Sequence, residues 1–581
     1  MKKIRKYISI IIFGGIFSIL STSCNDFLER EPLDGFTDQN YWSSEANVKA
    51  YAWRFYNLFM GYGKGTGTTA EYYFQSASAS TSVLISDDLT SNTFLQYQPN
   101  ASASNSNWSD LYEYIRRANI MLERLPNVPM DNAAREHWEG VARFFRAYYY
   151  FRLVQRFGDV PYYDSNVTDI NNVQVVFLPR TNRNEVMDKV RTDINSAVTL
   201  LKEQPEAINT NVVNKYVGLA LKSRICMYEG TYRKYHQLGN GTEYLQDAKS
   251  AANAIIISNR YSISSNYKAV YNSENLKGNS EILLYKEYLS GIAGNSIQAY
   301  TNTSTVVNGM TKAAIESYVC TDGLPISQSL QYQGDLNIAD VLANRDERLI
   351  AAVDDEGVCF RGYPVASLSR ARTSSTGYVV NLYYNPASPS ITTTGQNFID
   401  APVFGYAEVL LNYAEACAEL GSITQNNLDS TVNLLRTRAG ITPLTYISDD
   451  NIQAGGVTIN DPKRTGALEN ISGAVNSIIW EIRRERRAEL MGWTEMRYYD
   501  LMRWKKGDYL DYTNNPDVAL GIYVGVGATT EVTVNDDGYV YVYPGSNRVF
   551  DSNKHYLNSI PTGQRSLYNG EGIELTQNPG W

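Results

Sequence analysis

Apolar residues recur every three or four positions in two parts of the chain, which is the spacing of one face of an amphipathic helix. Pairs of such stretches separated by short turns are typical of helical-repeat scaffolds of the tetratricopeptide type, although the strict repeat signature is absent. Ser43 or Ser44 is placed to cap the first helix. The pattern predicts helices over about 41–60, 108–125, 132–157, 184–203, 212–230, 243–258, 405–420, 426–438, 474–492 and 495–504.

The rest of the sequence lacks long periodic stretches. It is rich in Gly, Ser, Thr and Asn from Gly61 to Asn107 and again over about 259–400, so we expect loops and short strands there. TTEVTVNDDGYVYVYPG alternates around Asp537-Gly538 and predicts a hairpin. The expected fold is mostly α, with a tetratricopeptide-like helical-repeat scaffold, an irregular loop-rich portion and short strands or hairpins. We expect one unit over 24–581, made of a scaffold (about 40–258 and 405–510), a loop-rich cap (about 259–404) and a C-terminal hairpin and tail (about 511–581).

The aromatic sequence FFRAYYYF (144–151) allows two interpretations. Three consecutive tyrosines could form a platform on which sugar rings stack, or they could lie buried in a helix. The residues that share one side of such a helix are Phe144, Tyr148, Phe151 and Val154. A continuous stripe of this kind usually packs in a core, so we predict that these tyrosines are structural.

Composition describes a folded, acidic protein. The chain has 43% apolar and 19% charged residues, a net charge of −9 and 45 Tyr. Tyr combines a flat apolar face with a hydroxyl, which suits wet surfaces that bind polar ligands as well as amphipathic cores. No basic stripe is present, so we expect no nucleic-acid partner. The three His and five Cys are scattered without metal-ligand spacing, and we predict no metal site and no cofactor.

The N-terminus reads as a targeting segment. MKKIRKYISIIIFGGIFSILSTSC has a basic start, an apolar run from Ile8 to Leu20 too short to span a bilayer, and small residues after it. Residues 1–23 are therefore predicted to be a signal peptide. Ser21-Thr22-Ser23-Cys24 resembles a bacterial lipobox, with Leu20 one place earlier than usual, which predicts lipidation of Cys24. The alternative is an ordinary secretory signal with an incidental Cys.

The other cysteines divide into two groups. Cys226 and Cys417 lie in helical patterns and are expected to be buried, inert thiols. Cys320 and Cys359 lie in loop-like sequence and could pair, which sequence alone leaves open.

Several separated motifs together resemble the SusD/RagB family of outer-membrane nutrient-binding lipoproteins, over nearly the whole chain. They are Phe27-Leu28-Glu29 after the lipobox, Tyr41-Trp42, Trp108-x-x-Leu111-Tyr112, EGVARFFRAYYYFRLVQRFGDVPYY (139–163), SYVCTDGLPI (317–326), NRDERL (344–349), YAEVLLNYAEACAELG (406–421), ERRAEL (485–490) with RYYDLMRW (497–504), and the terminal TQNPGW. Three departures are visible. Gly405 stands where the family often has Arg, the link MGWTEM (491–496) lacks the usual Glu-Gly and is one residue longer, and Ser559 replaces the first Pro of the usual Pro-Ile-Pro.

This resemblance implies a lipid-anchored protein on the outer surface of the outer membrane, above a SusC-like, TonB-dependent transporter. It would capture an oligosaccharide or polysaccharide and deliver it to that transporter, and the loop-rich portion would bind the ligand. A peptide-binding, RagB-like role in a peptide importer is the alternative. Four tetratricopeptide-like helix pairs are the fold it implies.

Nothing in the sequence requires catalysis. Glu415, Glu419, Glu485 and Glu489 lie in helical patterns, and Arg residues flank the last two, so we interpret them as members of structural ion networks. A glycosidase needs two carboxylates across a substrate cleft, and no motif here demands that arrangement. GYGKGTGTT (61–69) lacks the strand and the Lys-Ser/Thr ending of a phosphate-binding loop. We therefore predict a binding protein and not an enzyme.

Sugar binding needs aromatic faces and hydrogen-bonding groups on loops, outside the helical stripes. Tyr72, Tyr97 and Tyr300 come from distant segments that both interrupt the scaffold and could converge on one face. The candidate ligand-binding residues are Tyr72, Tyr73, Tyr97, Asn100, Tyr288, Tyr300, Arg372, Tyr378 and Tyr384.

Replacement of Cys24 by Ala should release the protein from membranes without changing its fold, because the acyl chains on this residue would supply the anchor. Membrane fractionation of the wild type and Cys24→Ala, expressed without the transporter, measures this. Continued association of the variant with outer membranes would contradict lipidation at Cys24.

Overall fold

The computed structural model describes eleven segments of the chain, and Cys24 lies outside them. These segments are residues 41–59, 61–64, 71–72, 86–91, 94–203, 211–301, 308–355, 374–388, 393–493, 495–526 and 532–581.

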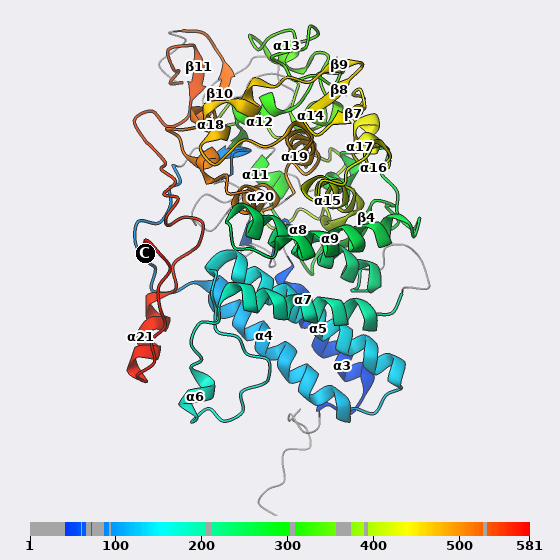
Figure 1. Ribbon diagram of the computed structural model, residues 1–581, viewed down its shortest axis with the longest axis vertical. Coiled ribbons are helices and arrows are strands. Elements are labelled where there is room, and N and C mark those ends of the chain that lie inside the picture. Colours follow the sequence, from blue (N-terminus) through cyan, green and yellow to red (C-terminus); the bar gives the residue numbers. More distant parts are fainter. Residues whose placement is uncertain are drawn as a thin grey trace, which may run out of the picture.

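The first half of the chain forms a stack of antiparallel helices. Helix α5 packs between α4 and α7, and α8 packs between α7 and α9 (Figure 1). Most of these helices begin at an Asn, Asp or Ser whose side chain accepts a hydrogen bond from the first turn, as with Ser44 before α3. The helices are α3 (Glu45–Ala52), α4 (Ser106–Arg124), α5 (Asn132–Phe157), α7 (Arg183–Leu200), α8 (Lys215–Tyr235) and α9 (Gly241–Ile256). All lie where the periodicity predicts them.

The second half returns to extend this stack. Helix α15 packs on α8 and α9, and α19 packs on α15 (Figure 1). The predicted helix over 426–438 is two helices, because Ser430 and Thr431 end one and begin the next. The elements are α15 (Tyr406–Glu419), α16 (Gln425–Asp429), α17 (Val432–Arg438), α19 (Ser477–Glu489) and α20 (Met496–Arg503). Short helices occur between them and near the ends: α6 (Val173–Val176), α10 (Ala269–Asn272), α11 (Ile297–Thr301), α12 (Lys312–Ser317), α13 (Ile338–Leu342), α14 (Glu347–Ala352), α18 (Ala467–Asn470) and α21 (Thr562–Gly570).

The strands are short and form small antiparallel ribbons. The pairs are β1 (Gly63–Lys64) with β2 (Glu71–Tyr72), β3 (Leu89–Ser91) with β5 (Asn308–Met310), β4 (Ile282–Lys286) with β6 (Ala401–Gly405), and β10 (Leu520–Tyr523) with β11 (Tyr539–Tyr541); β7 (Leu444–Ser448), β8 (Asn451–Ala454) and β9 (Val457–Thr458) form one three-stranded sheet. The turn predicted at Asp537-Gly538 is present, with Gly538 at φ +90° and a bridge between Val534 and Val540. The ladder partner of β11, however, is β10, which lies outside the predicted hairpin.

The aromatic stretch of α5 is buried in the core. Tyr149 donates from its hydroxyl to the carbonyl of Phe55 (2.8 Å), and Tyr150 donates to the carbonyl of Tyr163 (3.0 Å). Tyr148 packs on Phe59 and is also buried. Gly158, at φ +69°, ends the helix in a conformation that L side chains rarely adopt. The structural interpretation of the three tyrosines is confirmed.

The carboxylates singled out in the helices are engaged in buried ion pairs, as the sequence predicts. Glu415 binds both terminal nitrogens of Arg503 at 2.5 and 2.7 Å. Arg348 of α14 donates to Glu485 (2.5 Å) and Glu489 (2.9 Å) of α19. Ionised groups out of water are costly unless paired in this way, so these residues hold helices together.

Two of the departures from the family pattern, Gly405 and the link 491–496, lie against each other. A Cβ atom on Gly405 would stand 2.4 Å from the Trp493 ring, closer than any real contact. Trp493 is buried and belongs to the longer link between α19 and α20. Because the Trp493 ring fills this space, position 405 has room only for glycine.

Cys226, Cys320 and Cys417 are free, buried thiols. Burial raises the pKa of Cys226 to about 12 and also raises that of Cys417, as expected for inert thiols. Cys359 lies outside the described residues. Within the residues that the structure describes, no helix has the length and apolar composition needed to cross a bilayer.

Tyr148→Ala should lower the free energy of unfolding by about 3 kcal/mol, because it removes a buried ring and leaves a cavity. Tyr148→Phe is the matched control: it keeps the ring and loses only a long hydrogen bond from the hydroxyl to the Leu58 carbonyl (3.5 Å), so it should lie near the wild type. Chemical denaturation of the three proteins measures the difference. An alanine variant of wild-type stability would mean that the ring is not a core residue.

Candidate ligand-binding surface

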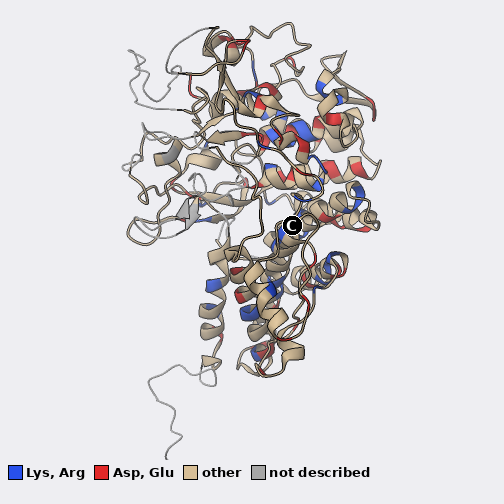
Figure 2. Cartoon of the chain, turned by 90° about the vertical axis from the view of Figure 1, so that its left-hand side faces the viewer, with Lys and Arg blue, Asp and Glu red and all other residues tan. Residues whose placement is uncertain are grey.

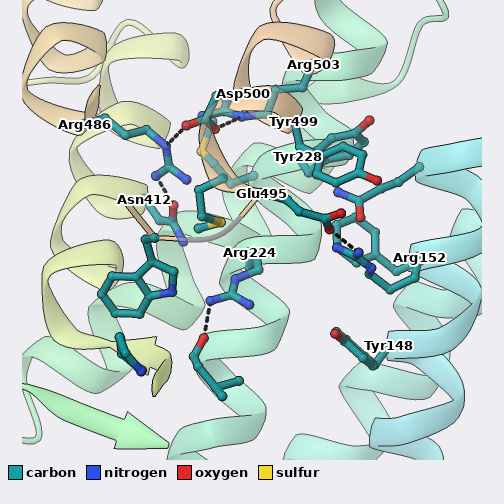
Figure 3. A pocket seen from close by; sticks show the side chains of 17 residues that line it. Tyr148, Arg152, Arg224, Tyr228, Asn412, Arg486, Glu495, Tyr499, Asp500 and Arg503 are labelled. Carbon is teal, nitrogen blue, oxygen red and sulfur yellow. Dashed lines mark hydrogen bonds and ion pairs between the residues drawn. The ribbon is translucent and has the colours of Figure 1, made fainter. Parts of the chain in front are cut away.

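A small, partly open cavity lies within the helical scaffold. It occupies about 70 Å³ between α5, α8, α15, α19 and α20. Its walls carry ion pairs: Glu495 faces Arg152, and Arg486 donates to Asp500 (2.7 Å) and Asn412 (2.8 Å) (Figure 3). Ligand pockets usually measure ~300–1,000 Å³, and a water molecule takes ~30 Å³. This cavity is therefore much smaller than a usual ligand pocket.

Three of the ribbons bring distant loops into one layer beside the scaffold. The described residues within 62–72, 89–91, 276–310 and 374–405, which contain β1 to β6, are called the loop layer below. Thr90 pairs with Gly309 across β3 and β5, and the Tyr62 N–H donates to the Tyr288 hydroxyl (2.9 Å). The described parts of the first loop region therefore contact the residues that flank Tyr300 in sequence.

Asp400 ties this layer together. Its two carboxylate oxygens accept the backbone N–H groups of Leu276 (2.9 Å) and Tyr288 (3.0 Å). Burial raises the pKa of Asp400 to about 7; the two N–H groups oppose the shift, and the nearby Glu287 and Glu274 add to it. One side chain thus holds both Leu276 and the start of the segment 288–301 at the residue that precedes β6.

Three adjoining segments of the loop layer carry no charged residue. The segments 288–301, 374–388 and 393–399 contain no Asp, Glu, Lys or Arg and are rich in Asn, Gln, Ser, Thr and Tyr. Figure 2 shows the contrast, since blue and red residues mark the helices while the strands and loops on the left are mostly tan. Such a surface offers hydroxyls, amides and rings, and no net electrostatic field.

Two of the candidate tyrosines are buried, so the prediction that they are exposed on loops is wrong. Tyr288 and Tyr378 are each only 1% exposed. The Tyr288 hydroxyl is used within the layer, by Tyr62. Tyr378 follows a tight turn in which its own N–H donates to Thr376 (3.2 Å), and it packs inward. Neither ring can stack on a sugar without unfolding the layer.

Tyr97 is also a packing residue and does not join the loop layer. Its ring stacks on His555 at 4.4 Å and meets Phe550 edge-on, and its hydroxyl is buried. The same segment continues along the C-terminal tail, where the Pro99 carbonyl accepts the Lys554 ammonium (2.8 Å). Asn100 is exposed beside this contact. The predicted convergence of Tyr97 with Tyr72 and Tyr300 is therefore wrong.

Tyr384 has a half-exposed ring in the loop layer. Its carbonyl accepts the Asn272 amide (2.8 Å), and the Lys268 ammonium lies 5.9 Å from its ring centre. The backbone of Tyr72 lies in β2 and that of Tyr300 in α11, both in this layer. Tyr73 and Arg372 lie outside the described residues.

Leu289 and Ile292 were not predicted as candidates, yet they are the exposed apolar residues of this layer, at 45% and 67%. They flank the tight turn that a bridge between Leu289 and Ala293 closes. The sequence-based prediction considered only polar and aromatic loop residues and therefore did not include these two. The Gly291 in LSGIAG does indicate the turn.

The described residues hold no group of His, Cys, Asp and Glu that could bind a metal ion.

Comparison with known proteins supplies the family. A model described as "SusD family" matches residues 255–581, more than half of the chain. The chain belongs to the SusD family. A second model, described as "Starch-binding associating with outer membrane", matches residues 26–227.

Relatives of this SusD-family chain are distant. SusD-like protein P38 of Formosa agariphila is 26% identical over 280 residues, which is 46% of this chain and 49% of the relative. The match thus spans about half the length of that protein.

Solved structures match over nearly the whole chain. A SusD-like carbohydrate-binding protein from Bacteroides fragilis is 21% identical with a TM-score of 0.67, over 91% of this chain and 99% of that one. Surface glycan-binding protein A from Bacteroides fluxus is 19% identical with a TM-score of 0.61, over 93% and 100%. These likenesses confirm the mostly helical fold class.

The raised pKa of Asp400 gives a pH dependence of known sign. The folded state keeps a proton up to about pH 7, whereas an unfolded aspartate loses it near pH ~3.9. This contribution to stability is present at low pH and is lost as the pH rises through about 7. Asp400→Asn does not titrate, so its melting temperature relative to wild type should increase between pH 5 and pH 8.

Asp536→Asn, at an exposed turn, is the control whose difference from wild type should stay constant. Melting curves of the three proteins at both pH values make the comparison. A constant difference for Asp400→Asn as well would show that Asp400 is ionised throughout.

Proposed function

We propose that this protein is a cell-surface lipoprotein that captures a neutral oligosaccharide or polysaccharide on its loop layer. It delivers the glycan to a SusC-like, TonB-dependent transporter, and acyl chains on Cys24 hold it to the outer membrane. The observation that carries the proposal is the absence of charge from three adjoining segments of a layer that is otherwise rich in hydrogen-bonding side chains.

Charge distinguishes the ligand classes. An anionic polysaccharide is bound by Lys and Arg, because buried or half-buried acid groups need a counter-charge. A peptide brings charged termini and often charged side chains, which also need partners. A neutral sugar needs amides and hydroxyls for its own hydroxyls and rings for its C–H faces. The segments 288–301, 374–388 and 393–399 supply only the last set.

Relatives support the ligand class and the location. Two structural neighbours are described as carbohydrate-binding or glycan-binding. The family model over residues 26–227 is described as starch-binding and associated with the outer membrane. Together with the lipobox-like sequence before Cys24, these names favour a surface-anchored glycan receptor.

Binding without catalysis fits the carboxylates of the scaffold. Glu415, Glu485 and Glu489 are buried and paired with Arg residues. Glycoside hydrolysis needs two carboxyl groups facing each other across the sugar. The described loop layer contains Glu71, Glu281, Glu287 and Asp400. Glu281 is buried and paired with Arg438 (2.9 Å), and the oxygens of Asp400 accept backbone N–H groups. The role proposed is therefore capture.

Affinity electrophoresis in gels that contain neutral polysaccharides (starch, β-glucan, xylan, mannan) or anionic ones (pectin, alginate) tests the proposal. We expect at least one neutral polysaccharide, and neither anionic one, to retard the wild type. Tyr384→Ala should weaken that retardation about fivefold, the effect of losing one stacking contact of ~1 kcal/mol. Tyr72→Ala and Tyr300→Ala should act in the same direction.

Tyr446→Ala is the matched control, because Tyr446 is a half-buried tyrosine in the separate sheet β7–β8–β9. It should bind like the wild type. Retardation by the anionic gels alone would contradict a neutral ligand. Peptides that co-purify with a protein that no glycan retards would favour the RagB-like alternative.

A further inference from the structure

The ribbon β10–β11 carries tyrosines on its outer face. Tyr523 pairs directly with Tyr539, and Leu520 pairs with Tyr541. Ile522 and Val540 alternate with these residues and are buried. Tyr523, Tyr539 and Tyr541 keep part of their surface in solvent. Over residues 539–541 the alternation thus places Val540 inward and Tyr539 and Tyr541 outward.

Polar groups hold these rings in place. Tyr539 donates from its hydroxyl to Asp335 (2.6 Å), and the Lys312 ammonium lies 4.8 Å from its ring centre. The ring of Tyr523 meets it edge-on at 5.6 Å. A ring fixed in this way loses little conformational entropy when a ligand stacks on it, which favours binding.

The loop that supplies Asp335 adds a further ring and several amides. Its sequence is QYQGDLN (331–337), with Gly334 at φ +93°. Tyr332 is half-exposed, and the Arg345 guanidinium lies 5.6 Å from its ring centre. Rings beside carboxylate and amide groups are the combination that binds a sugar's C–H face and its hydroxyls.

The ribbon is continuous with the loop layer. The Ile522 N–H donates to the Thr376 carbonyl (2.9 Å), and a Cβ atom on Gly521 would stand 2.1 Å from the same oxygen. Thr376 belongs to the uncharged segment 374–388. In Figure 1 the ribbon lies at the upper end of the molecule, on the same side as α12 and α13. The backbone of the ribbon is thus joined to the uncharged segment 374–388 of the loop layer.

We propose that Tyr332, Tyr523 and Tyr539 form a second glycan-contact surface, which a long polysaccharide occupies in addition to the loop layer. This inference rests on the function proposed above. A short oligosaccharide fills the loop layer alone. A longer chain reaches both surfaces and gains affinity because the second contact is then intramolecular.

Tyr539→Ala and Tyr332→Ala test the surface separately. The ligands are the neutral polysaccharide that retards the wild type and a short oligosaccharide cut from it, with binding measured by gel retardation and calorimetry. We expect each variant to lose about three- to tenfold in affinity for the polysaccharide, as expected for one stacking contact. Affinity for the oligosaccharide and the melting temperature should match the wild type.

Tyr539→Phe is the control, since it keeps the ring and removes only the bond to Asp335, and it should bind better than Tyr539→Ala. Unchanged polysaccharide affinity in both alanine variants would overturn the second surface and leave the loop layer as the site. Equal losses for both ligands would also overturn it, because the two surfaces would then be one. A wild type that no glycan retards would overturn the proposed function itself. If Tyr539→Ala lowers the melting temperature, the polysaccharide affinity of Tyr332→Ala alone tests the second surface.

Discussion

The structure depends on a buried lattice of ion pairs centred on α19. Its sequence EIRRERRAE places alternating charges inside the protein, and different elements neutralise them. Glu485 meets Arg348 of α14 and Arg436 of α17, Arg486 meets Asp500 of α20, and Arg487 meets Asp88 beside β3. A buried ion that loses its partner costs about 3–5 kcal/mol. The helix can therefore take only the position in which every charge is matched.

This lattice also connects the scaffold to the ligand side. Asp87 and Asp88 come directly before β3, and they bind Arg497 of α20 and Arg487 of α19. Strand β3 pairs with β5, so the same contacts locate the segment that follows α11. Charge is thus concentrated where the scaffold and the loops join, whereas the adjoining segments of the loop layer have none. The scaffold provides rigidity, and the loops remain available for an uncharged ligand.

Local replacements are tolerated when their neighbours compensate. Gly405 and Trp493 each depart from the usual family sequence, but the ring occupies the space that a side chain at position 405 would need. Either change alone would create a clash or a cavity. The pair shows how a distant member of the family retains the junction between β6 and the α19–α20 link.

The sequence by itself determined the helices and their interior. Periodicity and capping residues are local signals, so the boundaries of α5, from the Asp131 cap to Gly158, and the burial of Tyr148 were predictable. The tertiary structure decided the loops. Tyr288 is buried and bonded to Tyr62 and Asp400, and Tyr97 packs on Phe550 and His555; these partners are more than a hundred positions away in each case. In an irregular segment, the burial of a side chain depends on which distant part of the chain packs over it, and the local sequence does not contain that information. For the same reason, the local sequence did not predict that β11 pairs with β10.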